Sequence, residues 1–295
     1  MAYTPNNPNG QATMANSAPV VIASDQSDVS VVGDKTLSEV VSATANSLLV
    51  RPIDFGLQVQ RGLHTGITFN NKFGRNAATV TGDAIWSAST AYVEPATAAQ
   101  CNVVSTDADD DGSPAGAGAR TILITGIDSN YDIVSETVTL DGTNNVLTAN
   151  SYWNIHRAYV VTAGSDSGAQ GTITITSTAA GTPVIGNIAF GYNQTQSTVY
   201  MVPRNYTAYI NLPQVTMQTT TANLTMDIGL FKKDFGGVFR IQNDWLLTGS
   251  GDHLQVKFFG APLKYEAKST ILFKCISASA SADVSVDYDI WLVAD

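Results

Sequence analysis

The sequence is short of charged residues: only 14% of its 295 residues are Asp, Glu, Lys or Arg, about half the usual share. Acidic residues outnumber basic ones, and the formal net charge is -10. Phosphate binding needs a basic surface, so this composition argues against a nucleic-acid partner. One local exception runs from Arg51 to Arg75, where Arg61 and Lys72 add to the positive charge and Asp54 is the single acid. This stretch could face an acidic partner, although a solvated loop is the preferred interpretation.

Cysteine is also scarce, and long apolar runs are missing. Cys101 and Cys275 are far apart and lack metal-ligand spacing, so we expect two reduced thiols, as in a protein assembled in a cytoplasm. Cys275 alternates with Ile271 and Phe273, which predicts a buried position. Residues 1–16 are polar and unlike a signal peptide, and no apolar run approaches membrane-spanning length. We therefore expect no membrane association.

Motifs that bind cofactors or carry catalysis are missing too. The sequence contains no phosphate loop, dinucleotide fingerprint or zinc-helix motif. His64, Asp107 and Ser167 follow the His…Asp…Ser order of trypsin-like proteases. The residues around Ser167 and His64 do not match those enzymes, and a glycine-rich turn explains Ser165-Asp-Ser-Gly168 better. We expect no enzyme activity, no catalytic residue and no cofactor.

The segment Asp107-Ala-Asp-Asp-Asp-Gly112 resembles the first half of a calcium-binding loop. Asp107, Asp109 and Asp111 place oxygens at alternate positions, and a glycine stands sixth. The twelfth position is Gly118 instead of the usual bidentate glutamate. These three aspartates are the candidate site for weak calcium binding, and a solvated acidic turn is the alternative.

Abundant Thr, Ser, Asn, Ala and Gly suit a β-sheet protein, and the stretch 120–142 illustrates this. Ile122 and Ile124 alternate with threonines, turn formers follow from Gly126 to Asn130, and the chain returns through Val134 and Val138. Glu136 interrupts the apolar face of the returning strand. This pattern predicts a β-hairpin.

Similar patterns predict two β-sandwich or jelly-roll-like domains, an all-β fold. The first covers residues 61–195 and the second covers 196–295, with 179–197 as a candidate linker. Val284, Val286, Tyr288, Ile290 and Leu292 alternate with polar residues in the last strand and should point inward. The other expected strands are 77–80, 90–93, 102–105, 153–162, 172–176, 206–212, 224–230, 238–242, 254–258 and 270–275.

Residues 1–60 are expected to form an extended N-terminal arm. Residues 1–17 are polar and rich in Pro and Asn, and a capping-box pattern at Thr36–Glu39 makes a short helix over 36–48 an alternative to a strand. The segment 55–71 is interpreted as extended. Apolar residues in 19–32 could add to the sheet edge of a neighbouring protein: Pro19, Val20, Val21, Ile22, Val29 and Val31.

Several residue types have a structural and a functional interpretation. His156 and His253 have no spaced ligand partner, so a metal site is not expected. The Asn-x-Thr triplets are glycosylation acceptors in form only: Asn193, Asn205 and Asn223. Four aromatic residues could stack on a sugar if exposed, although core packing is the default for Trp86, Tyr92, Trp153 and Trp245.

Three stretches resemble virion proteins of tailed bacteriophages. The first is the N-terminal segment Ser17-Ala-Pro-Val-Val-Ile-Ala-Ser-Asp-Gln-Ser27. The second joins Gly118-Ala-Arg-Thr-Ile, Gly126-Ile-Asp-Ser-Asn-Tyr and Ser135-Glu-Thr-Val-Thr-Leu-Asp-Gly142. The third joins Asp234-Phe-Gly-Gly-Val-Phe239 and Asp283-Val-Ser-Val-Asp-Tyr-Asp-Ile. Related proteins have a glycine-rich segment where this chain has Asp83-Ala-Ile-Trp86.

The resemblance implies a non-enzymatic structural protein of a phage particle, assembled in the host cytoplasm. It implies a homotrimer, because projecting phage proteins are often trimeric and strand edges need cover. A tail-associated fibre or adaptor anchored by the N-terminal arm is preferred to a capsid decoration (cement) protein or head fibre. Expected partners are further copies of the chain and the tail or major capsid protein. A module that binds a host glycan is a further alternative.

Overall fold

The computed structural model describes residues 30–31, 35–36 and 55–295. The chain divides into two compact units, Met1–Leu57 and Gln58–Asp295. In the first unit, strand β1 (Ser30–Val31) pairs antiparallel with β2 (Lys35–Thr36). Helix α2 covers Phe55–Gln60, so the extended conformation predicted for 55–71 is wrong over these residues. Two predictions lie outside the described residues except at one position each: the helix over 36–48, of which only Thr36 is described, in β2, and the arm contact through Pro19, Val20, Val21, Ile22, Val29 and Val31, of which only Val31 is described, in β1.

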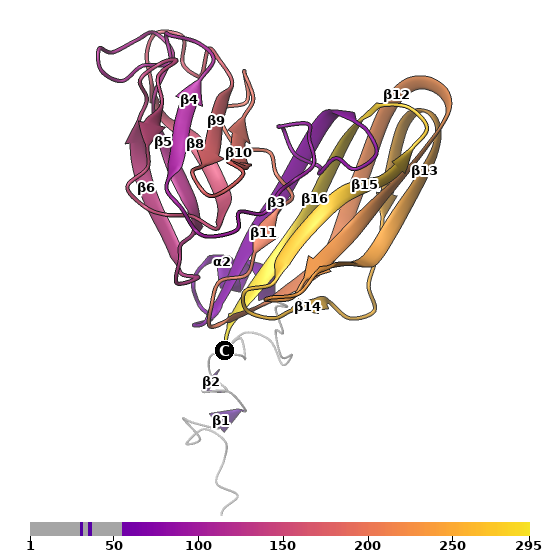
Figure 1. The fold of residues 1–295 in the computed structure, drawn as a ribbon. Coiled ribbons are helices and arrows are strands. Elements are labelled where there is room, and N and C mark those ends of the chain that lie inside the picture. The colour runs from indigo at the N-terminus through magenta and orange to yellow at the C-terminus, as the bar shows by residue number, and fades with distance from the viewer. Residues whose placement is uncertain (1–29, 32–34, 37–54) are drawn as a thin grey trace, which may run out of the picture. The chain divides into compact units, whose positions relative to one another are not determined.

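The second unit is almost entirely β-structure, and its strands pair antiparallel. We call residues 101–188 the inserted sandwich. Its strands form two sheets, in the orders β10-β9-β4-β7 and β6-β5-β8 (Figure 1). Their bounds are β4 Cys101–Ser105, β5 Ala119–Ile127, β6 Ile133–Thr139, β7 Val146–Leu147, β8 Asn154–Ala163, β9 Ile173–Ser177 and β10 Val184–Ile188.

Side chains from both sheets form one apolar core in the inserted sandwich. Ile122 and Ile124 of β5 pack in the same cluster as Ile173 and Ile175 of β9, and all four are fully buried. The alternation of apolar and polar residues therefore buries one face of each sheet, as a half-exposed strand requires. The predicted all-β fold with sandwich-like packing is confirmed.

The predicted hairpin is confirmed as β5 and β6, which pair from Thr121–Thr139 to Ile127–Ile133. Glu136, which interrupts the apolar face of β6, has a structural role of its own. Its carboxylate accepts hydrogen bonds from the Ala149 N–H (2.7 Å), the Asn150 N–H (2.9 Å) and the Tyr152 hydroxyl (2.8 Å). Glu136 therefore holds the loop that leads into β8.

The other strands form a seven-stranded sheet, which we call the long-strand sheet. Figure 1 shows its first strand, β3, beside its last, β16. The strands are β3 Ile67–Thr79, β11 Tyr200–Met201, β12 Tyr206–Lys233, β13 Phe239–Val256, β14 Leu263–Tyr265, β15 Thr270–Ala278 and β16 Ala282–Ala294.

The pairing of β3 with β16 differs from the domain division expected from the sequence. Residues 61–195 were expected to form one domain, yet β3 lies in the sheet of the C-terminal strands, from Ile67–Val293 to Thr79–Ala282. The inserted sandwich thus interrupts the long-strand sheet in sequence. Local patterns could not show this, because they do not specify which distant strand is the partner. The boundary at 195/196 stays a prediction, since 58–295 forms one compact unit.

The core of the long-strand sheet depends on a bend in β12. Its first half pairs with β16 and its second half with β15, and the two halves meet at an irregularity between Thr219 and Leu224. Asn223 has a positive φ of 55° there. Both halves contribute to one buried cluster with Phe273, Cys275 and the inward residues predicted for β16, all of which are buried.

Four sequence predictions require correction. Residues 90–93 form no strand, and the candidate linker 179–197 contains β10, which pairs with β9. The strands expected at 206–212 and 224–230 are parts of β12, because bulges accommodate the irregular residues between them. The strand expected at 254–258 is the end of β13, which stops at Val256, and Leu254, Val256 and Phe258 are exposed by 60%, 37% and 80%.

A single buried carboxylate, Asp110, ties the loops of the inserted sandwich together. Its Oδ1 accepts hydrogen bonds from the Ala119 and Gln170 N–H groups, both at 2.8 Å. Its Oδ2 accepts from the Ser105 hydroxyl (2.6 Å) and the Gly171 N–H (2.9 Å). Asp110 is fully buried, so its charge is compensated by four donors instead of a cation.

We predict that Asp110→Asn lowers the free energy of unfolding by about 2–3 kcal/mol, because either orientation of the amide places its NH₂ against a backbone N–H donor. Urea unfolding followed by circular dichroism measures this change. The matched control is Asp109→Asn, an exposed neighbour that should shift stability by less than about 0.5 kcal/mol. Equal stability of the two variants would contradict the role assigned to Asp110.

Candidate functional site

The residues of the protease-like pattern have separate hydrogen-bond partners. His64 Nε2 lies 2.8 Å from Gln58 Oε1, and the Asp107 carboxylate accepts a hydrogen bond from the Asp109 N–H (2.9 Å). Ser167 is exposed in a turn, with a positive φ of 59°. No described hydrogen bond joins these three residues. The glycine-rich turn is therefore the better interpretation of Ser167.

The acidic loop uses its carboxylates for local hydrogen bonds. Asp107 bonds to the Asp109 N–H, and Asp111 Oδ1 accepts from the Ser113 N–H (2.7 Å). In the part of the chain that the structure describes, no group of three or more His, Cys, Asp or Glu side chains could hold a metal ion. Calcium binding by Asp107, Asp109 and Asp111 stays an untested prediction.

The asparagines of the three Asn-x-Thr triplets share a left-handed backbone conformation. Asn193, Asn205 and Asn223 all have positive φ angles, of 55°, 61° and 55°. Asparagine tolerates this left-handed conformation better than most residues, which explains its presence at these positions.

Two of the four candidate sugar-stacking residues are core residues: Trp86 and Trp245 are exposed by 1% and 0%. Tyr92 packs edge-on against Trp86, and its hydroxyl oxygen accepts a hydrogen bond from Asn154 Nδ2 (3.2 Å). Trp153 is half-buried and stacks on Tyr131, with ring centroids 5.7 Å apart. Among these residues, Trp153 lies at a pocket.

That pocket, which we call the aromatic pocket, has a volume of about 580 Å³ and is lined by Tyr131, Trp153, Phe235, Phe239 and Lys268 among others. Lys268 Nζ lies 4.7 Å from the centre of the Tyr131 ring and 4.9 Å from that of Phe235. Such cation–π contacts hold the ammonium group over the ring faces. The pocket brings together two stretches of the phage-like resemblance, Gly126–Tyr131 and Asp234–Phe239.

Two residues that line this pocket have a left-handed backbone conformation. Tyr131 and Lys268 have positive φ angles of 66° and 65°, which are unusual for residues with large side chains. Glu94 at the same pocket pairs with Lys233 and accepts a hydrogen bond from the Thr270 hydroxyl (2.8 Å). The sequence gives no local signal for Lys268 or Phe235 as site residues, because their common location depends on turns far apart in the chain.

A second candidate surface is the outer face of β13. This strand pairs with β12 alone among the described strands. The two halves of β13 are joined by side-chain hydrogen bonds: Gln255 Nε2 donates to the Leu246 carbonyl (2.6 Å), and Lys257 Nζ, just after the strand, donates to Asn243 Oδ1 (2.7 Å). Four outward apolar residues of β13 remain exposed, two on each side of the bend that it shares with β12: Ile241 51% and Leu246 56%, then Leu254 60% and Val256 37%. We call these four residues the β13 strip.

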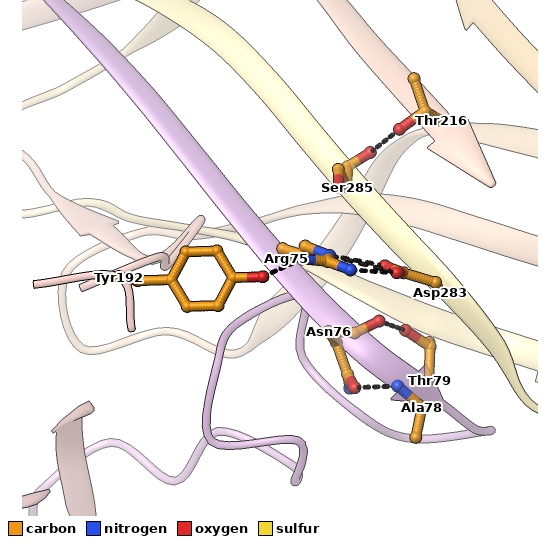
Figure 2. Close-up of polar contacts among 8 residues, drawn as sticks. All are labelled: Arg75, Asn76, Ala78, Thr79, Tyr192, Thr216, Asp283 and Ser285. Atoms are coloured by element: carbon orange, nitrogen blue, oxygen red, sulfur yellow. Dashed lines mark hydrogen bonds and ion pairs between the residues drawn. The ribbon is translucent and has the colours of Figure 1, made fainter. Parts of the chain in front are cut away.

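Arg75 of β3 links the inserted sandwich to the long-strand sheet. Figure 2 shows its guanidinium between Asp283 of β16 and Tyr192, which follows β10. Its Nε donates to the two Asp283 carboxylate oxygens at 2.9 and 3.1 Å, and its Nη1 donates to the Tyr192 hydroxyl. Arg75 therefore joins the segment that follows β10 to strands β3 and β16 of the long-strand sheet, and it is not a free cation.

Lys72 and His156 form a second link between the same parts. Lys72 Nζ donates to the His156 carbonyl, while His156 Nε2 donates to the Met201 carbonyl (2.8 Å). The His156 ring stacks on Tyr200, with centroids 4.1 Å apart. Burial lowers the pKa of His156 to about 3 and, helped by the Arg157 charge, lowers that of Lys72 to about 7. His156 is a neutral structural residue.

In the described residues, no helix is long and apolar enough to cross a membrane. Cys101 and Cys275 are free and buried, and burial raises their thiol pKa values to about 12 and about 11. Neither thiol is therefore a reactive group at neutral pH.

Comparison with protein families and with curated proteins finds no match. Solved structures of infectious bursal disease virus share a low level of similarity. The structure of its Gx strain is 11% identical over 77% of this chain and 71% of that chain, with a TM-score of 0.21. The VP2 subviral particle is 11% identical over 78% and 77% of the two chains, with a TM-score of 0.17. At these TM-scores the similarity supports no functional argument.

We predict that the stability difference between the wild type and Lys72→Met depends on pH. Folding lowers the pKa of Lys72 to about 7, so the cost of its buried charge is complete below pH 7 and is relieved as the amine deprotonates at higher pH. Between about pH 7 and pH 10 the wild type should gain about 1.4 kcal/mol per pH unit relative to the variant.

Urea unfolding at pH 6, 7.5 and 9 measures this difference. In the control Lys264→Met, which removes an exposed lysine of β14, the difference should stay constant over this range. If the stability difference between the wild type and Lys72→Met is also independent of pH, folding does not lower the pKa of Lys72, and the prediction is wrong.

Proposed function

We propose that the chain is a non-enzymatic structural component of a virus particle, assembled in the host cytoplasm, that contacts further copies of itself and other virion proteins. The observation that carries this proposal is the β13 strip, an exposed apolar surface on a strand at the edge of a sheet. Exposed apolar side chains on edge strands favour association, and soluble monomers usually avoid them. The resemblance of three stretches to tailed-phage virion proteins supports the same assignment.

Within that role, we favour a homotrimeric tail-associated fibre or adaptor held by its N-terminal arm. The segment 17–27 carries the N-terminal part of the resemblance, and its apolar residues suit addition to a neighbouring sheet edge. A capsid decoration protein or head fibre is the alternative. Quantitative mass spectrometry of purified particles separates these roles: a few dozen copies or fewer indicate the tail, and hundreds indicate decoration.

A glycan-binding role is a second candidate, and the aromatic pocket favours it. Half-buried Trp153 and exposed Phe235 line a space of about 580 Å³, which is sufficient for a saccharide. Tryptophan fluorescence titrated with host polysaccharide tests this role. Quenching that is absent in Phe235→Ala would support it, and no quenching at millimolar sugar would argue against it.

The self-association test uses the β13 strip. We predict that the full chain forms oligomers at micromolar concentration, and that the double variant Leu246→Lys, Leu254→Lys is monomeric, because charges on the apolar strip oppose its burial. Size-exclusion chromatography with light scattering measures the mass.

The matched control is Thr137→Lys, an exposed position of β6 in the inserted sandwich. It should leave the oligomer intact. An oligomer that survives in the double variant, or a wild type that is monomeric at all concentrations, would refute self-association through this strip.

A further inference from the structure

A pocket beside Lys72 combines positive charge with apolar walls. It has a volume of about 510 Å³ and is lined by residues of β3, β5, β8 and β11, including Lys72, Arg157, Phe69, Tyr159 and Tyr200. None of the described residues that line it is an aspartate or glutamate. We call it the basic pocket. Its size lies within the usual range for small-molecule sites.

The two cations of the basic pocket have carbonyl and ring partners, and no described carboxylate among them. Lys72 is 5% exposed and donates to the His156 carbonyl, and Arg157 Nη2 donates to the Asn71 carbonyl (2.8 Å) while its guanidinium lies over the Phe73 ring. Neither forms an ion pair with a described carboxylate. Arg120, Lys268 and Lys274 are likewise held by a carbonyl or by aromatic rings. The described basic residues with an ion pair are Arg75, Arg204, Lys232, Lys233, Arg240, Lys257 and Lys264.

This arrangement is unfavourable unless something compensates the charge. Burying a cation without a counter-charge is costly, and two cations near each other add repulsion. Repulsion from the Arg157 charge lowers the pKa of Lys72. Among 25 acidic residues in the sequence, none of those described approaches the pair closely enough for an ion pair. Lys72 and Arg157 also keep N–H donors for which the structure describes no acceptor.

We propose that the basic pocket binds a small organic anion through its carboxylate, with Lys72 and Arg157 as the recognising cations. The carboxylate supplies the missing counter-charge and accepts the free N–H donors of both side chains. The apolar walls formed by Phe69, Tyr159 and Tyr200 contact the body of the ligand, and the volume is sufficient for an amino acid or a monosaccharide. This site is separate from the β13 strip and does not depend on the proposed function.

Binding must also change the protonation of Lys72. The groups that face it are His156 and Arg157 of β8, Tyr200 of β11 and, from the paired strand β16, Tyr288. His156 is neutral above about pH 3, and burial raises the pKa values of both tyrosines, so Lys72 is the group that titrates near neutral pH. A bound carboxylate favours the ammonium form. Binding at pH 8 should therefore take up a proton.

The test is isothermal titration calorimetry of the full chain at low salt with glucuronate, glucose and inorganic phosphate. We expect glucuronate to bind at pH 6, to bind at least tenfold more weakly at pH 9, and to take up a proton at pH 8 in two buffers of different ionisation enthalpy. Glucose matches its shape without the charge and should not bind. Phosphate binding without glucuronate binding would overturn the choice of a carboxylate.

Two variants locate the site. Lys72→Met and Arg157→Gln should each weaken glucuronate binding at least tenfold. Arg157 is half-buried and Lys72 is buried, so Arg157→Gln is the variant that disturbs the core less. The control Lys264→Gln removes an exposed cation of the long-strand sheet and should bind like the wild type. Binding that persists in both pocket variants, or no binding to the folded wild type at 10 mM glucuronate, would overturn the proposal.

Discussion

The bend of β12 is the constraint on which the long-strand sheet depends. One continuous strand pairs with β16 before the bend and with β15 after it, so its inward residues reach both sides of a single core. Val215 and Leu230, on opposite sides of the bend, are both fully buried. The bend also carries β13, its partner over both halves, and leaves the outer face of β13 to solvent. The same geometry therefore forms the core and the exposed β13 strip.

Period-two alternation predicted most of the individual strands because burial of one sheet face acts on local sequence. β16 and the hairpin of β5 and β6 were predicted with correct inward faces. The continuity of β12 was not predicted, because Pro213 and Asn223 indicate breaks, whereas bulges absorb them within one strand. The pairing of β3 with β16 joins residues more than 200 positions apart, and nothing in a local pattern specifies such a partner.

The candidate sites were harder to predict because they depend on tertiary contacts. The spacing of Asp107, Asp109 and Asp111 indicated a candidate calcium site in the acidic loop. The buried residue between them, Asp110, instead connects the loops of the inserted sandwich through its hydrogen bonds. The excess of basic residues from Arg51 to Arg75 is evident in the sequence. The interpretation of this stretch as a solvated loop is wrong for Lys72, which lies in β3 and is buried. Burial of a lysine by a distant strand leaves no local signal.

The protein presents docking surfaces on a β scaffold, and the β13 strip, with its four exposed apolar residues, is the one on which the proposed function rests. A cryo-EM map of the particle that encodes this chain, at a resolution that separates side chains, is the most direct measurement of that claim. The account predicts the chain in the particle with Leu246 and Leu254 of the β13 strip against a neighbouring protein. A particle that lacks the chain, or one in which this face borders only solvent, would contradict it.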